Sequence, residues 1–290
     1  MMVKGLVLSL LLVTATVTAE YNETLAKVLL TLSASAYNED PNECLSNRFG
    51  NAALVERYEV DCDSTDNNTC AAYIALIHDE QAIALVFRGT VGHNQLELEV
   101  LAGLALPKNF QDTDTKVNKY FDIAFGDLWA SGIPAQIEKL RKDYPSYKLW
   151  VTGHSLGAAL ASLGSLALSL DGTWNESNSE HYTFAKPRVG HKNYADLHNK
   201  YVPGHYRVVH AHDTITNTYP IIFGYLHEKN WIWYNNDMTP GSSYVECSGE
   251  FDPKCAAYQI LDSDLMYAHR HYFNVTVTAY GKEGCPTAIF

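Results

Sequence analysis

Three features are scarce in this sequence: clusters of positive charge, long apolar segments and closely spaced cysteine pairs. The chain has 21 Lys and Arg against 33 Asp and Glu, which gives a formal net charge of −12 over 290 residues. No run of basic residues offsets this excess. The charge pattern therefore argues against a nucleic-acid partner and against strong binding to an acidic membrane surface.

The apolar segment at the N-terminus is too short to span a bilayer, which takes about 20 apolar residues. In MMVKGLVLSLLLVTATVTAE, Lys4 precedes an apolar stretch at residues 5–13, and small residues surround Ala19. This order is typical of a secretory signal peptide cleaved after Ala19. We expect residues 1–19 to be a signal peptide and residues 20–290 to be secreted, extracellular and without a transmembrane segment.

The six cysteines do not form any Cys-x2-Cys pair, which argues against a zinc site. An even number in an exported chain predicts disulfides instead, although six cysteines allow fifteen pairings. Four Asn-x-Ser/Thr sequons are candidate glycosylation sites on the surface. The sequons begin at Asn22, Asn67, Asn175 and Asn274, and the cysteines are Cys44, Cys62, Cys70, Cys247, Cys255 and Cys285.

The chain contains no internal repeat, low-complexity tract or Pro/Ser-rich linker, so we expect one domain over residues 20–290. Apolar spacing and turn residues predict alternating strands and helices. This alternation indicates an α/β fold with a mostly parallel central sheet covered by helices. We expect helices at residues 25–37, 123–142, 156–170 and 192–201, and strands at 71–79, 82–89, 148–152, 181–186, 205–210 and 230–235.

A serine stands at the corner between a strand and a helix in KLWVTGHSLGAALASL, residues 148–163. In a parallel sheet such a corner projects the Ser155 hydroxyl at the functional edge. Gly153 and Gly157 remove side chains that would collide across the sharp turn, and the amide of Leu156 would be free to bind an oxyanion. We interpret Ser155 as a nucleophile, and the alternative is a plain tight turn.

A serine nucleophile needs a base, and the base needs an orienting acid. Asp213 follows a predicted strand and would reach the same sheet edge, although an Asp there also commonly starts a turn. Composition cannot select the base, because many histidines follow the serine. They include His191, His198, His205, His210, His212, His227, His269 and His271.

Five segments in order make the sequence resemble the class 3 lipases, the fungal triacylglycerol lipase family of α/β-hydrolases. They are VFRGT, YPSYKLWVTGHSLGAALASL, KPRVG, RVVHAHDTITNTYP and HRHYF. The resemblance implies Ser155 as nucleophile, Asp213 as acid and His269 as base. It also implies that Thr90 and the amide of Leu156 form the oxyanion hole.

The same resemblance implies three disulfides and a lid. The disulfides are Cys44 with Cys285, Cys62 with Cys70, and Cys247 with Cys255. The implied lid lies within residues 90–107, where Leu96, Val100, Leu101 and Leu104 make a helical stripe, although residues 96–100 also fit a strand in a fixed loop. His269 and His271 would point the same way in an extended segment, and only the resemblance selects His269.

These observations predict a secreted serine esterase acting on lipid esters, with a triacylglycerol lipase as the leading hypothesis. No metal or organic cofactor is expected, the protein is expected to be a monomer, and its contact with a lipid–water interface would be transient. Three alternatives stay open. They are an esterase for soluble or aromatic esters, a phospholipase A1, and a secreted binding glycoprotein on a lipase fold.

Overall fold

The computed structural model describes residues 20–62, 69–91, 106–174, 176–255 and 266–289. An eight-stranded sheet runs through the molecule in the order β1-β2-β3-β6-β7-β9-β11-β12. The five strands from β3 to β11 are parallel, and β1, β2 and β12 pair antiparallel at the two edges. The strands are β1 (Ala52–Asp61), β2 (Thr69–Ile77), β3 (Ala82–Phe87), β6 (Lys148–His154), β7 (Ser179–Phe184), β9 (His205–His210), β11 (Trp231–Tyr234) and β12 (Val245–Cys247).

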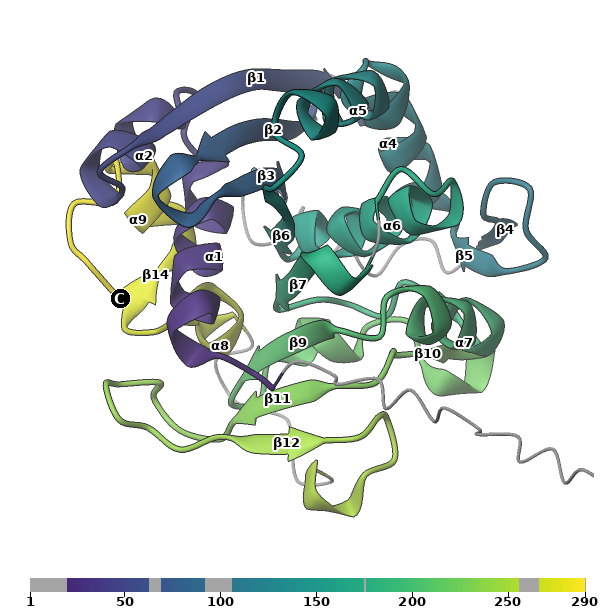
Figure 1. Cartoon of the computed structure of the whole chain (residues 1–290). Coiled ribbons are helices and arrows are strands. Elements are labelled where there is room, and N and C mark those ends of the chain that lie inside the picture. Colours follow the sequence, from purple (N-terminus) through teal and green to yellow (C-terminus); the bar gives the residue numbers. More distant parts are fainter. Residues whose placement is uncertain (1–19, 63–68, 92–105, 175, 256–265, 290) are drawn as a thin grey trace, which may run out of the picture.

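Helices cover both faces of this sheet (Figure 1). Strand β3 shows the reason, because its six residues are all buried. Ile83, Leu85 and Phe87 belong to the core shared with α4 (Lys119–Ala130), α5 (Ile133–Asp143) and α6 (Leu156–Leu170). The alternate residues Ala82, Ala84 and Val86 belong to the core shared with α1 (Glu23–Ser35) and α9 (Val277–Lys282). The predicted mostly parallel, helix-covered sheet is confirmed.

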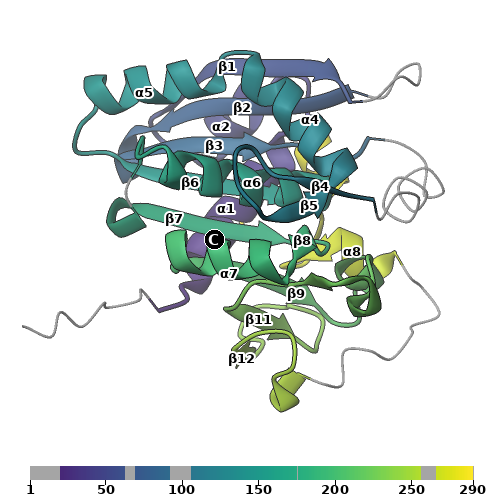
Figure 2. The ribbon, with the colours of Figure 1, turned by 90° about the vertical axis from the view of Figure 1, so that its right-hand side faces the viewer.

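Smaller elements surround the main sheet (Figure 2). A four-stranded sheet has the order β10-β8-β5-β4, and β13 pairs with β14. These elements are β4 (Pro107–Asn109), β5 (Lys116–Asn118), β8 (Gly190–His191), β10 (Tyr225–Leu226), β13 (His271–Tyr272) and β14 (Val275–Thr276). The other helices of the described residues are α2 (Asn42–Arg48), α7 (Lys192–Tyr201), α8 (Tyr267–Arg270), and the 3-10 turns η1 (His78–Glu80), η2 (Glu176–Asn178), η3 (Thr214–Asn217) and η4 (Ile221–Phe223).

One predicted element was wrong: the helix expected at residues 123–142 is two helices, α4 and α5. The break falls at Gly132, whose φ of 118° is incompatible with a right-handed helix and strained for a residue with a Cβ. Pro134 then lies in the first turn of α5, where its missing N–H costs no helical hydrogen bond. The apolar spacing continued across the break and concealed it.

The described residues bear on several smaller expectations. The cysteines pair as Cys44–Cys285, Cys62–Cys70 and Cys247–Cys255, the pairs that the family resemblance implies. Asn22 and Asn274 are exposed, whereas Asn67, Asn175 and most of the expected lid fall outside the described residues. Within the described ranges, none of the helices has the length and apolar character needed to cross a membrane.

Candidate active site

The corner between β6 and α6 holds Ser155 in a strained backbone conformation, with φ 59° and ψ −124°. A Cβ at Gly153 would lie 2.3 Å from the carbonyl oxygen of Gly157, and one at Gly157 would lie 2.2 Å from that of Phe87. Both distances are far below a van der Waals contact, so neither position tolerates a side chain. The two glycines therefore permit the sharp turn that places the Ser155 hydroxyl beyond the end of β6.

Three residues from distant parts of the chain meet at this corner. Ser155 Oγ lies 2.9 Å from His269 Nε2. His269 Nδ1 lies 3.1 Å and 3.0 Å from the two carboxylate oxygens of Asp213. A carboxylate only accepts hydrogen bonds, so Nδ1 carries the proton and Nε2 is left to accept from Ser155. This is the geometry that a serine, a general base and an orienting acid require.

The Asp213 carboxylate is held from several sides. Its Oδ1 accepts a hydrogen bond from the Ile215 N–H at 3.0 Å, which makes Asp213 the N-cap of η3. Its Oδ2 also accepts a longer bond from the Tyr272 hydroxyl at 3.5 Å. Asp213 thus starts a turn and faces His269 at the same time, so the two interpretations made from the sequence are compatible.

Leu156 and Thr90, the residues that the family resemblance implies as the oxyanion hole, each have a polar group that is free to donate. Leu156 is the first residue of α6, and the first N–H groups of a helix have no acceptor within the helix. Thr90 lies three residues beyond β3, and its buried Oγ1 has no hydrogen-bond partner among the described residues. An unpaired buried hydroxyl is costly, so Thr90 Oγ1 is a donor available to a ligand.

The structure separates the two histidines that the sequence could not distinguish. His269 lies in the short helix α8 rather than in the extended segment assumed above, so it does not share a side with His271. The two ring nitrogens of His271 contact the Tyr267 carbonyl and Thr276 Oγ1, each at 2.8 Å. His271 therefore has both nitrogens engaged away from Ser155.

Sequence reasoning missed His154, which directly precedes Ser155 and received no role there. Its ring is buried between Tyr37 Oη, 2.8 Å from Nδ1, and the backbone carbonyl of His269, 2.7 Å from Nε2. Burial and the neighbouring His269 lower the pKa of His154 to about 3, so the ring is neutral. An uncharged residue beside the nucleophile left no distinctive signal in the sequence.

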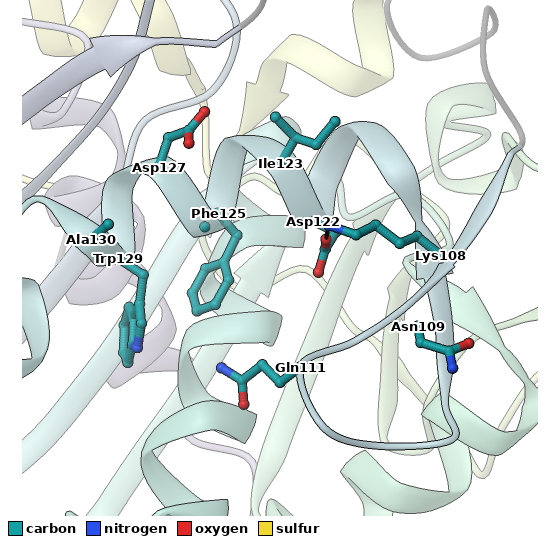
Figure 3. Close-up of a pocket in the computed structure, with 10 residues that line it drawn as sticks. Lys108, Asn109, Gln111, Asp122, Ile123, Phe125, Asp127, Trp129 and Ala130 are labelled. Carbon is teal, nitrogen blue, oxygen red and sulfur yellow. Dashed lines mark ion pairs between the residues drawn. The ribbon is translucent and has the colours of Figure 1, made fainter.

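An open pocket of about 470 Å³ lies elsewhere, between α4 and the chain around β4 (Figure 3). Lys108 and Asp122 form an ion pair at its edge, and Phe125 and Trp129 line its wall. None of Ser155, Asp213 or His269 lines it. The described residues also include no group of three or more His, Cys, Asp or Glu arranged to hold a metal ion.

Comparison with known proteins identifies the family of this chain. The sequence profile of the family described as lipase (class 3) matches residues 84–223. A Caenorhabditis elegans lipase is 32% identical over 92% of this chain and 83% of its own length. A Rhizomucor miehei lipase is 28% identical over 74% of this chain, which spans 61% of that longer relative.

Solved structures agree at the level of the fold. The Rhizomucor miehei triacylglyceride lipase has a TM-score of 0.74 at 23% identity, covering 88% of this chain and 96% of its own. A lipase from Rhizopus microsporus has a TM-score of 0.75 at 22% identity, covering 90% and 91%. The fold is therefore that of the α/β-hydrolases. The chain belongs to the class 3 lipase family, and it is accordingly a carboxylic ester hydrolase.

Proposed function

We propose that this chain is a secreted triacylglycerol lipase in which Ser155, His269 and Asp213 form the catalytic triad. The observation that carries the proposal is the continuous hydrogen-bonded chain from Ser155 Oγ through the imidazole of His269 to the Asp213 carboxylate. All three side chains are buried, where such contacts are stronger than in water. A solved triacylglycerol lipase of similar fold, 24% identical, is described as having a serine protease triad as its catalytic centre.

In this proposal Ser155 Oγ attacks the ester carbonyl carbon while its proton passes to His269 Nε2. The resulting imidazolium is stabilised by Asp213, which stays ionised. Collapse of the tetrahedral intermediate expels the alcohol, which takes the proton from Nε2 and leaves an acyl ester on Oγ. Water then attacks that ester while one of its protons passes to Nε2. When this second intermediate collapses, the fatty acid is released and Ser155 Oγ takes the proton back from Nε2.

The negative charge that develops on the carbonyl oxygen would be bound by the Leu156 N–H and by the N–H and hydroxyl of Thr90. These donors are held by the start of α6 and by the end of β3, so little reorganisation is needed as charge develops. Loss of one such donor typically costs about 10²- to 10³-fold in kcat. The unpaired Thr90 hydroxyl supports this role more directly than sequence alone could.

Two observations support a lipid rather than a soluble ester as substrate. Relatives of this chain are described as lipases, including the nematode and fungal enzymes. Large apolar side chains are also exposed on segments that follow site residues in the sequence: Val91 follows Thr90, and Ile222 and Phe223, 85% and 58% exposed, come after the Asp213 turn. Exposed apolar surface is favourable against a lipid–water interface, so we propose that these side chains contact that interface. We also propose that this contact is transient.

Secretion is supported by residues 1–19, which have the order of a signal peptide, and by the three disulfides. We propose that the mature protein begins near Glu20, acts outside the cell as a monomer, and carries glycans at some of Asn22, Asn67, Asn175 and Asn274. The expected lid within residues 90–107 remains part of this proposal.

A second candidate is a lipase for mono- and diacylglycerols. A Fusarium solani relative described as a secreted mono- and diacylglycerol lipase is 28% identical over 71% of this chain and 61% of its own length. The two candidates share the same triad and differ only in how many acyl chains the substrate carries.

The test is hydrolysis of a panel of emulsified tri-, di- and monoacylglycerols, a phosphatidylcholine and a soluble short-chain ester, with Ser155→Ala as the blank. A triacylglycerol lipase hydrolyses the triacylglycerol emulsion and loses this activity in Ser155→Ala. Cleavage of partial glycerides alone selects the second candidate. Cleavage of phospholipid or of soluble ester alone selects a phospholipase A1 or an esterase, and no hydrolysis selects a binding protein.

A further inference from the structure

The helix that carries His269 is too short to hold itself in place. Helix α8 has four residues, Tyr267–Arg270, whereas isolated helices need about 12–15 residues to be even marginally stable. The last four carbonyls of any helix also lack partners within it. Some other part of the protein must therefore hold the backbone of α8, because the position of His269 follows the position of this backbone.

Three successive carbonyls of α8 each face an imidazole nitrogen. The Tyr267 carbonyl lies 2.8 Å from His271 Nδ1, and the Ala268 carbonyl lies 3.2 Å from His210 Nδ1. The carbonyl of His269 itself lies 2.7 Å from His154 Nε2. A carbonyl oxygen only accepts, so in each contact the ring nitrogen is the one that carries the proton.

His154 and His210 come from the two strands that also present the other members of the triad. His154 ends β6 and directly precedes Ser155, and His210 ends β9, three residues before Asp213. Both rings are buried, and Figure 2 shows α8 beside β9. A single peptide segment of α8 is therefore tied to the nucleophile's strand and to the acid's strand.

The two rings use opposite nitrogens. His154 donates from Nε2, and its Nδ1, 2.8 Å from Tyr37 Oη, must accept the tyrosine's proton. His210 donates from Nδ1. Burial lowers the pKa of both imidazoles, and hydrogen bonds of the His210 ring to the backbone of Ala268, His271 and Asn236 oppose the shift at His210. A neutral imidazole carries one proton, and the position of that proton decides whether the ring can donate to α8.

We propose that His154 and His210 are positioning residues that form an imidazole clamp, holding the α8 backbone so that His269 meets both Ser155 and Asp213. The clamp acts through hydrogen bonds to the Ala268 and His269 carbonyls and touches no reacting atom. It rests on the proposed function, because positioning matters only if His269 is the base. A displacement of the base by about 1 Å can cost about 10²-fold in rate.

Opposite nitrogens predict opposite rescue by amide side chains. In place of a histidine, the amide nitrogen of Asn lies near the position of Nδ1, and that of Gln lies near Nε2. His154→Gln should therefore keep a donor to the His269 carbonyl, whereas His154→Asn should lose it. At the second position His210→Asn should keep a donor to the Ala268 carbonyl, and His210→Gln should lose it.

We expect kcat on a soluble short-chain ester to fall about 10- to 100-fold in His154→Asn and His210→Gln. It should stay within about fivefold of wild type in His154→Gln and His210→Asn. KM should change less than about twofold throughout, because neither residue contacts the ester. The rate of fluorophosphonate labelling of Ser155 should follow kcat, since it reports the same Ser155–His269 contact.

The matched control is His181, a buried histidine on β7, between the strands of the clamp. Its Nε2 contacts Ser179 Oγ at 3.0 Å, on the same strand. His181→Asn and His181→Gln should lower the melting temperature but leave kcat within about twofold, without preference for one amide. A preference for Gln at 154 and Asn at 210, absent at 181, separates positioning from general loss of stability.

Tyr37→Phe tests the clamp without altering either histidine. It removes the hydroxyl that holds the Nδ1 of His154 unprotonated, so part of the population should lose the donor at Nε2. We expect kcat to fall about three- to tenfold, with little change in KM. If the histidine variants do not fold, the kcat of Tyr37→Phe alone tests the clamp.

The outcomes separate the clamp from the proposed function. Equal kcat for Asn and Gln at both clamp positions, or unchanged kcat in Tyr37→Phe, overturns the clamp while an inactive Ser155→Ala leaves the triad standing. Activity that survives in Ser155→Ala overturns the proposed function itself.

Discussion

Among the described residues, two buried groups that each contain a serine, a histidine and a carboxylate differ in the order of their hydrogen bonds. The first is Ser155, His269 and Asp213. The second, the interior cluster, is Ser162, His198 and Glu228, with Ser162 two turns further along α6. Ser162 Oγ lies 2.9 Å from Glu228 Oε1 and 3.2 Å from His198 Nε2.

The two groups differ in the order of their contacts. In the first, the imidazole lies between serine and carboxylate, so it can accept a proton from one side while the acid holds the other. In the interior cluster the serine lies in the middle: it donates to Glu228 and accepts from the hydroxyl of Tyr194 at 3.0 Å. Because Ser162 donates its only hydroxyl proton to Glu228 Oε1, it can only accept from His198 Nε2, so this imidazole cannot act as its base.

The carboxylates differ in their partners as well. Glu228 forms a fully buried ion pair with Lys186. Burial alone would raise the pKa of Glu228, but the charge of Lys186 outweighs it and holds this pKa well below its usual range. Residue types alone therefore do not distinguish the two groups, whereas the order of their hydrogen bonds does.

Removal of each serine should separate the two groups by the largest difference in kcat. Ser155→Ala should lower kcat by about 10⁴- to 10⁶-fold with little loss of stability, because the side chain supplies the nucleophile. Ser162→Ala should keep kcat within about threefold but lower the free energy of unfolding by about 1–3 kcal/mol, because buried partners lose hydrogen bonds. Kinetics on a soluble ester and urea unfolding measure both. Residual activity above about a tenth in Ser155→Ala would remove Ser155 as nucleophile.

The histidines give the next comparison. His269→Ala should fall to the residual level of Ser155→Ala, and the double variant should cost little more, because the two residues act as a unit. His271→Ala should stay within about tenfold of wild type, since its nitrogens contact Tyr267 and Thr276. The same kinetic assay decides. If the two single variants exchange these outcomes, His271 is the base.

The ion pair between Lys186 and Glu228 of the interior cluster should affect only the stability of the protein. Lys186→Met leaves the buried Glu228 carboxylate without its cation, which should lower the free energy of unfolding by about 3–5 kcal/mol. Adding Glu228→Gln should recover part of this loss. Lys142→Met, which breaks the exposed pair with Glu138, is the matched control and should have no measurable effect. Equal urea midpoints for Lys186→Met and Lys142→Met would contradict the assignment.

Acid should weaken the fold through buried neutral histidines. Burial lowers the pKa of His181 to about 3 and that of His205 to about 4. The unfolded chain, with pKa values near 6.5, therefore binds protons first, so stability is complete above about pH 6.5 and falls as pH drops towards 4. Each such histidine contributes up to about 1.4 kcal/mol per pH unit.

Urea unfolding at about pH 7.5 and about pH 5 measures this effect. His181→Gln removes one of these groups, so its stability should depend less steeply on pH than that of wild type. An equal slope for both proteins would show that His181 is not neutral in the folded state.

Local patterns predicted much of the fold. The strand, corner and helix of residues 148–170 were recognisable because β-branched and apolar residues, two glycines and an apolar run follow one another directly. Strand β1 was missed because it lies at an edge of the sheet, where all but one of its residues are half-exposed or exposed. The split of residues 123–142 was missed because apolar spacing continued across Gly132, and only its backbone angle ends the helix.

The sequence named Ser155, Asp213 and His269 as site residues, but it did not indicate the buried histidines that contact the backbone of α8. A family resemblance selected His269, where residue chemistry left several histidines open. His154 and His210 were missed because each contacts a backbone carbonyl, which any residue presents equally and which therefore leaves no trace in the sequence.

The sequence by itself determined the class of fold, the strained corner at Ser155 and the presence of an acid and of bases after it, because these depend on residues adjacent in the chain. Only the tertiary structure decided which imidazole faces Ser155, which of its nitrogens accepts, and why Ser162 with His198 and Glu228 is not a second triad. His154 and His269 are 115 positions apart, and Ser162 and Glu228 are 66 apart. Contacts over such separations follow from the order of strands in the sheet, because that order brings the ends of β6 and β9 to one edge.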